Sequence, residues 1–278
     1  GVRDFVTCGA IGYAGPTQSD CDTDYSGTSL ASEVTVTGGI QTWTVPTTGT
    51  YLIEGYGAQG ASGDSSYVGG LGAYMSGEFS LTVGDVLTII VGQEGSGQSS
   101  GSNGGGGGGS FVLNSSGTPL LIAGGGGGTR TSVVDNGCDG LTSGYGGEGS
   151  GSGTTGLCSA TGTLGQGGAV SSGSWGSGGA GINGDGSADY SIGGGQAIVD
   201  GGEGGDGSSA GGCGDTADGG FGGGGSGRGC YGGGGGGGYT GGEGGRVAGG
   251  GGSYNSGANP SNTAGVQSGD GEIHIDLQ

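Results

Sequence analysis

The sequence predicts a mainly β protein in which a β-sandwich is joined to a large glycine-rich region. Segments of alternating apolar and polar residues, typical of strands, occupy the first part of the chain and its last residues. Glycine accounts for 91 of the 278 residues, with 20 in the first 100 and 71 in the remaining 178. Because only 4 prolines are present and the glycines form uninterrupted runs, a collagen triple helix does not fit. Glycine also destabilises helices, so a long helical bundle does not fit either.

Two hairpins are predicted in the N-terminal part. Each consists of two segments rich in β-branched and aromatic residues, separated by a short turn. The paired segments are residues 39–46 with 50–58, and residues 73–81 with 85–91. Trp43 and Val45 share one face of their strand, as do Tyr51 and Ile53. Residues 86–91 are apolar on both faces, which is typical of a central strand in a sandwich.

Later segments extend this pattern. Residues 110–113 and 119–123 form a third predicted hairpin. In residues 272–277, isoleucine and leucine alternate with polar residues, so the C-terminus is expected to pair with the N-terminal sheet. We therefore expect a sandwich of residues 1–103, completed by residues 271–278, and a glycine-rich region of residues 104–270.

The glycine runs have two interpretations. They cover residues 104–109, 124–128, 222–225, 232–238 and 249–252. One interpretation is a flexible linker. The other is a set of packed polyglycine II helices, which have three residues per turn and must bond sideways to their neighbours. The apolar strands between the runs, and Cys213 and Cys230 on either side of one run, favour the ordered form. Tyr231 and Tyr239 flank the longest run and are expected to cap its ends.

Charge excludes several functions. The chain has 24 acidic residues against 4 arginines and no lysine, which gives a net charge of −20. Nucleic acids and anionic membranes both require clustered cations on the protein, so we expect neither as a partner. The longest apolar stretch, residues 86–91, is far shorter than a membrane span, so we expect no membrane insertion. Basic proteins or cations fit this charge better.

The cysteines suggest disulfides and an extracellular location. None of the six forms a C-x-x-C pair, which argues against a zinc ribbon. Six thiols allow about 15 pairings. Pairing of nearest neighbours joins Cys8 with Cys21, Cys138 with Cys158, and Cys213 with Cys230. The chain begins with Gly1 and shows no signal sequence, so we interpret it as a mature or trimmed chain. Asn114, in Asn-Ser-Ser, is a candidate glycosylation site.

Several motifs, taken in their order along the chain, resemble those of a known family. They include Cys8-Gly-Ala, Gly15-Pro-Thr-Gln18, Cys21, Gly39-Ile-Gln-Thr-Trp-Thr-Val-Pro46, Thr50-Tyr-Leu-Ile53, Gly55-Tyr-Gly-Ala58 and Val91-Gly-Gln93. Later blocks continue in order through Gly219-Gly-Phe-Gly222 and Cys230 to Gly271-Glu-Ile-His274. Together they resemble the glycine-rich extracellular region of the anaplastic lymphoma kinase and leukocyte tyrosine kinase family.

This resemblance implies a TNF-like jelly-roll β-sandwich with a large insertion of polyglycine II helices. In that family the module binds small basic cytokines and helps to dimerise the ectodomain. The sequence departs from the family pattern in two places. Cys138 and Cys158 are additional, and the acidic loop before the last strand is reduced to Asp270 and Glu272. Ligand-binding residues are therefore not transferred to this chain one by one.

No catalytic site is expected. His274 is the single histidine, and its place in an alternating strand favours a structural role over general-base chemistry.

We expect no cofactor, and a calcium site is the weaker alternative. Asp20, Asp22 and Asp24 match the start of an EF-hand loop, but Tyr25 and Ala31 stand where glycine and glutamate are needed. Residues 201–206 match part of a calcium-binding repeat once.

Three functions remain, and the sequence favours the first. The first is a non-catalytic structural or adhesive extracellular protein that self-assembles into a filament or surface layer, with residues 1–7 joining a neighbour's sheet edge. The alternative is a ligand-binding ectodomain module of a receptor-tyrosine-kinase-like protein that recognises a small basic protein. The third is an ice-binding protein, which would require a regular triplet that the serine, aspartate and tyrosine insertions interrupt.

Overall fold

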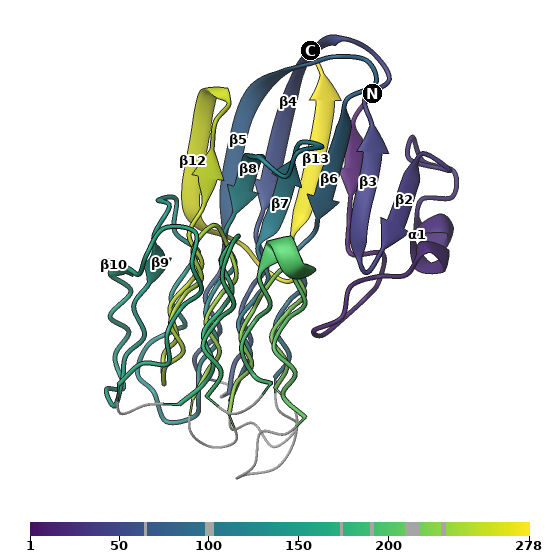
Figure 1. Cartoon of the computed structure of the whole chain (residues 1–278). Helices are drawn as coiled ribbons and strands as arrows, with labels where there is room; N and C mark the ends of the chain where they lie inside the picture. The colour runs from purple at the N-terminus through teal and green to yellow at the C-terminus, as the bar shows by residue number, and fades with distance from the viewer. Residues whose placement is uncertain (64–65, 98–102, 173–174, 190–191, 209–216, 229–231) are drawn as a thin grey trace.

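The described residues form a mainly β protein with two antiparallel sheets and a bundle of extended glycine-rich segments at one end (Figure 1). The computed structural model describes residues 1–278 except 64–65, 98–102, 173–174, 190–191, 209–216 and 229–231. The N- and C-termini lie near each other at the end of the sheets away from the glycine-rich segments.

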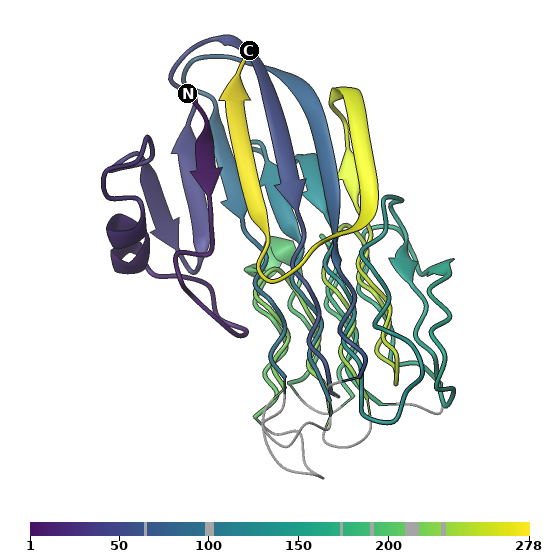
Figure 2. The ribbon, with the colours of Figure 1, turned by 180° about the vertical axis from the view of Figure 1, so that it is seen from behind.

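The first sheet has five strands, and Figure 2 shows it from its outer side. Their order is β1 (Arg3–Phe5), β13 (Glu272–Leu277), β4 (Gly49–Tyr56), β5 (Gly72–Leu81) and β12 (Ala258–Gln267). The last strand therefore lies between the first strand and β4, as the alternation in residues 272–277 predicts.

The second sheet has six strands. Their order is β11 (Tyr254–Asn255), β8 (Pro119–Ala123), β7 (Ser110–Leu113), β6 (Val86–Ile90), β3 (Ile40–Thr44) and β2 (Val34–Thr37). Strand β6 is interior, as its apolar sequence predicts. Outside the sheets lie helix α1 (Gln18–Asp24), the 3₁₀ turn η1 (Ile198–Asp200) and the short pair β9 (Gly146–Gly147) and β10 (Ala160–Thr161).

The main core is formed by one face of each sheet. Trp43, Tyr51 and Phe5 come from β3, β4 and β1 and are at most 1% exposed. Their rings contact edge to face, with centroids 6.1 Å apart for Phe5 and Trp43 and 6.4 Å for Trp43 and Tyr51. The buried positions alternate along β4 and β13, which leaves every second side chain on the outer surface.

Two of the three predicted hairpins are wrong. Strands β3 and β4 belong to different sheets, and so do β5 and β6. Both connections cross between the sheets side by side, where Val45 N–H donates to Asp85 O at 2.8 Å and Gly84 N–H donates to Val45 O at 2.9 Å. The turn residues are present, with Gly84 at a φ of 91°. They reverse the chain from one sheet into the other because both strands bury apolar faces in the same core.

The third predicted hairpin is confirmed, because β7 and β8 pair directly. It also moves the expected boundary between the two regions. Strands β7, β8, β11 and β12 all come from residues 104–270 and complete the two sheets. The sandwich therefore uses more of the chain than residues 1–103 and 271–278. The apolar side chains of β7 and β8 are buried in the core, whereas β12 is mostly exposed at the edge of its sheet.

The glycine-rich segments bond to several neighbours at once, with a period of three residues. Donors 233 and 236 bond to carbonyls 245 and 249, donors 234 and 237 bond to carbonyls 104 and 107, and donors 235 and 238 bond to carbonyls 177 and 180. A β-strand directs its bonds to two sides with a period of two, so this pattern differs from a sheet. Residues 232–238 are all buried.

Candidate functional site

The outer surface of the five-stranded sheet carries a group of acidic and aromatic side chains. In β13, Ile273 and Ile275 are fully buried, so Glu272, His274 and Asp276 lie on the opposite face. The same alternation applies to β1, β4 and β5. We call this surface the acidic face; it consists of Asp4, Glu54, Tyr56, Tyr74, Glu78, Glu272, His274 and Asp276.

Strand register aligns these residues in rows across the sheet. One row contains Asp4, His274 and Glu54, which are successive partners on β1, β13 and β4. The next contains Glu272, Tyr56 and Tyr74 on β13, β4 and β5. Directly paired positions in an antiparallel sheet bring side chains within contact distance. Residues that are far apart in the sequence thus form one continuous surface.

Hydrogen bonds hold the side chains of the acidic face in place. The Tyr74 hydroxyl donates to Glu54 Oε1 at 2.7 Å. His274 lies between two carboxylates, with Nδ1 2.7 Å from Asp4 Oδ1 and Nε2 3.0 Å from Glu272 Oε2. A neutral imidazole has a single N–H, so both contacts are hydrogen bonds only when both ring nitrogens carry a proton. His274 is thus paired with a carboxylate on each side.

Tyr56 lies between Glu272 and Tyr74 in the second row of the acidic face. Its ring centroid is 4.9 Å from that of Tyr74 and 5.7 Å from that of His274. Burial, and then the nearby charges of Glu54 and Glu272, raise the pKa of the Tyr56 phenol. Burial likewise raises the pKa of Tyr74. Both phenols therefore stay neutral at physiological pH and present amphipathic rings beside the carboxylates.

The acidic face carries carboxylates but no lysine or arginine among the described residues. Across the five strands, no outward-facing position of the described residues is lysine or arginine. Arg3 on β1 points to the inner side, where its guanidinium lies 5.6 Å from the Trp43 ring and 3.8 Å from Glu33 Oε2. Clustered carboxylates without lysine or arginine among them attract a cationic surface and accelerate its association. The arrangement is suited to binding a basic partner.

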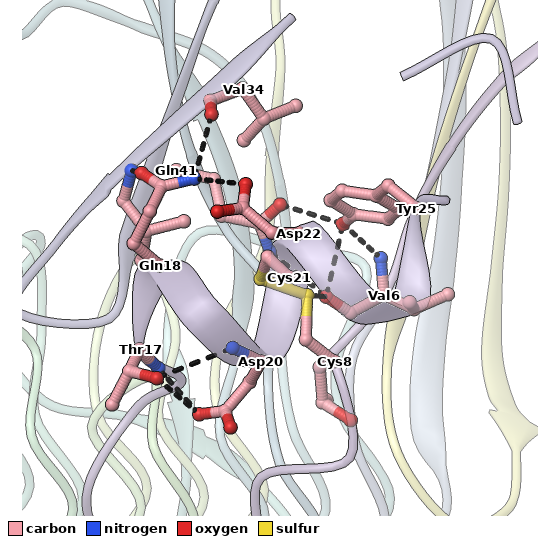
Figure 3. Close-up of a disulfide and its surroundings, with 12 residues drawn as sticks. Val6, Cys8, Thr17, Gln18, Asp20, Cys21, Asp22, Tyr25, Val34 and Gln41 are labelled. Atoms are coloured by element: carbon pink, nitrogen blue, oxygen red, sulfur yellow. Dashed lines mark hydrogen bonds between the residues drawn. A yellow bond between two sulfur atoms is a disulfide. The ribbon is translucent and has the colours of Figure 1, made fainter. Parts of the chain in front are cut away.

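The N-terminal disulfide fixes the strand that contributes Asp4 (Figure 3). Cys8 and Cys21 are bonded, which ties the segment after β1 to α1. Thr17 caps this helix through a reciprocal pair of contacts with Asp20. The hydrogen bond from Thr17 lowers the pKa of Asp20.

The aspartates predicted as the start of a calcium loop lie on this helix. Asp20 accepts from Thr17, and Asp22 accepts from the amide of Gln18 at 2.9 Å. In helical conformation Asp20, Asp22 and Asp24 do not form an EF-hand loop. Across the part of the chain that the structure describes, no group of three or more histidine, cysteine, aspartate or glutamate residues is arranged to hold a metal ion.

The structure contains a second disulfide, between Cys138 and Cys158. Cys138 is 2% exposed and packs with Val133 and Val247 in a small apolar cluster within the glycine-rich region. Cys213 and Cys230 lie outside the described residues, so their pairing stays a prediction.

The candidate glycosylation site lies in the loop between β7 and β8. Asn114 Oδ1 accepts hydrogen bonds from the backbone and hydroxyl of Ser116, at 3.0 and 2.8 Å. Of the two tyrosines predicted to cap the longest glycine run, Tyr239 stacks on Tyr254 with centroids 5.2 Å apart, while Tyr231 lies outside the described residues.

Sequence reasoning did not find the acidic face. Its acidic residues are spread from Asp4 to Asp276, and of these Glu272 alone belongs to one of the family-like motifs, Gly271-Glu-Ile-His274. The alternation of residues 272–277 was the one available signal, because it predicts a polar outer row on the last strand. The partners of that row depend on the strand order.

Comparison with known proteins shows homology over part of the chain. The chain is 44% identical over 95 residues to the leukocyte tyrosine kinase receptor of Mus musculus. The match covers 33% of this chain and 11% of the receptor. It confirms the resemblance to the family of anaplastic lymphoma kinase and leukocyte tyrosine kinase. No protein-family model matches the chain. Among the described residues, no helix is long and apolar enough to span a membrane.

Proposed function

We propose that the chain is an extracellular, non-enzymatic ligand-binding module, of the kind found in receptor-tyrosine-kinase-like proteins, that binds a small basic protein through its acidic face. The observation that carries this proposal is the set of five carboxylates on one sheet surface without lysine or arginine among them. Homology to a receptor kinase supports the ligand-binding class. The two disulfides support an oxidising, extracellular location.

We further propose that the two sheets form a TNF-like jelly roll and that the glycine-rich segments are packed polyglycine II helices. The period-three hydrogen bonding of residues 233–238 supports the helices, because polyglycine II has three residues per turn. Such packing makes a stiff base that keeps β4, β5 and β13 in register, and the acidic face depends on that register.

The self-assembling structural role and the ice-binding role, which the sequence also suggests, stay predictions and are not part of this proposal. The contact proposed for self-assembly was the addition of residues 1–7 to a neighbour's sheet. In the structure, β1 pairs instead with β13 of its own chain. Homology to a receptor favours ligand binding over either role.

The acidic face is tested by removing its charge. The face variant combines Glu54→Gln, Glu78→Gln, Glu272→Gln and Asp276→Asn. The matched control combines Asp24→Asn, Glu148→Gln, Asp200→Asn and Glu203→Gln, which removes the same charge away from the face. Binding of each protein to immobilised cytochrome c, a basic probe, is measured by surface plasmon resonance at several salt concentrations, with acetylated cytochrome c as the neutralised probe.

We expect the face variant to bind at least about tenfold more weakly than the wild type, and the control to stay close to the wild type. Wild-type binding should weaken as salt rises, because the charges on this surface are exposed to screening. Equal losses in the two variants would mean that net charge, and not the acidic face, attracts the probe, and would overturn the proposal.

A further inference from the structure

A second surface with different chemistry lies where the glycine-rich region meets the sandwich. It is a groove of about 400 Å³, at the lower end of the volumes typical of small-ligand sites. Its lining includes Met75 of β5, Tyr254 of β11 and Asn262 of β12, together with Tyr145, Leu164 and Tyr239 from the glycine-rich region. Both parts of the fold therefore build this tyrosine groove.

Aromatic rings dominate the tyrosine groove. Tyr239 and Tyr254 stack with an interplanar angle of 23°. Tyr145 is 45% exposed and Leu164 is 49% exposed, although both are large and partly apolar. A packed core would have covered these side chains. Their exposure around a concave surface is typical of a ligand site.

The polar groups of the tyrosine groove are neutral, and several are free to bond. No residue among the described lining is aspartate, glutamate, lysine, arginine or histidine. The hydroxyls of Tyr145, Tyr239 and Tyr254 make no hydrogen bond within the described part of the chain. Asn262 Oδ1 accepts from Asn255 Nδ2 at 2.9 Å, which leaves the Asn262 amide N–H groups available as donors.

We propose that the tyrosine groove binds a neutral saccharide, as a mono- or disaccharide unit. The C–H face of a pyranose ring packs on an aromatic ring, and its hydroxyls pair with phenol and amide groups, which are the two kinds of group present here. A cationic ligand would find no carboxylate in the lining, and an anionic one would find no cation while facing a chain of net charge −20. A purely apolar ligand would bury the free hydroxyls without partners.

The test uses saturation-transfer NMR with chitotriose, mannotriose, cellotriose and maltotriose at millimolar concentration. The groove variants are Tyr145→Ala and Asn262→Ala, both at exposed positions. The control is Tyr13→Ala, a partly exposed tyrosine outside the groove. A second arm measures, by surface plasmon resonance, binding to ovalbumin, an acidic glycoprotein, and to enzymatically deglycosylated ovalbumin, and so separates a protein-borne glycan from a free sugar.

We expect the wild type and the control to bind at least one of these probes, and each groove variant to bind it about tenfold more weakly. Absence of wild-type binding to all four sugars and to ovalbumin would overturn the proposal. Equal signals from the wild type and Tyr145→Ala would do the same. Because the groove variants retain the acidic face, their binding to cytochrome c reports separately on the proposed function.

Discussion

The hydroxyl of Tyr25 donates a hydrogen bond to Gln41 Oε1 at 2.7 Å inside the core of the sandwich. The same hydroxyl accepts from the backbone N–H of Val6 at 3.1 Å. One phenol thus joins the segment after α1 to β3 and to the end of β1. Tyr25 is 4% exposed, and burial raises its pKa to about 12.

This shift predicts that the protein loses stability at high pH. The unfolded chain releases the Tyr25 proton near its ordinary pKa of about 10, while the folded chain keeps it until about 12. The stabilisation is therefore complete below pH 10 and is lost between pH 10 and 12. We expect the free energy of unfolding to fall by about 2 to 3 kcal/mol across this range through Tyr25.

The measurement is urea unfolding at a series of pH values, compared between the wild type and Tyr25→Phe. The variant is less stable at neutral pH because it leaves the Gln41 oxygen without its donor. It lacks the ionisable hydroxyl, so the difference between the two proteins should shrink as pH rises from 10 to 12. A constant difference would contradict the assignment of the raised pKa to Tyr25.

A single methyl group in the glycine-rich bundle is predicted to disrupt it. A Cβ at Gly236 would overlap the carbonyl oxygen of Gly125, which belongs to a neighbouring segment. Since the obstacle is backbone, no side chain can rotate away. We expect Gly236→Ala to destabilise the protein by about 3 kcal/mol or more, measured by urea unfolding.

Gly97→Ala is the matched control for this substitution. Gly97 is exposed, and the nearest atom to its Cβ would be the carbonyl oxygen of Ser62 at 3.3 Å. We expect a change of less than about 1 kcal/mol at this position. Similar losses for the two variants would show that glycine content as such, and not close packing of the segments, determines stability.

Local periodicity predicted the strands well and their partners poorly. The alternation in residues 272–277 and the apolar character of residues 86–91 depend on neighbours along the chain, and both strands are as predicted. Residues 47–49 have the composition of a hairpin turn, yet they connect two sheets. A short turn looks the same in the sequence whether the next strand pairs with the previous one or packs across from it.

The acidic face could not be predicted from the sequence for a related reason. Glu54 and Tyr74 are hydrogen-bonded but 20 residues apart, and His274 bonds to Asp4 at the other end of the chain. The net charge of −20 predicted a basic partner. It did not indicate a surface, because position on the surface follows from register, and register depends on long-range pairing.

The disulfide between Cys138 and Cys158 is predicted to stabilise the glycine-rich region. It closes a loop with a sequence separation of 20 residues, for which the loss of chain entropy in the unfolded state corresponds to about 3 kcal/mol. We expect the double variant Cys138→Ser and Cys158→Ser to lose about this much in urea unfolding. Cys138 belongs to a small apolar cluster with Val133 and Val247, which is separate from the core around Trp43.

Hydrogen exchange separates the effects on the two regions. Backbone amides of residues 247–251 should exchange faster in the double variant, because Val247 packs beside the lost disulfide. Amides of β4 and β13, in the main sandwich, should change little. Cys8→Ser with Cys21→Ser is the comparison, since it releases α1 beside β2, the edge strand of the second sheet. If it accelerated exchange at residues 247–251 as strongly, the stabilisation by Cys138 and Cys158 would be global rather than local.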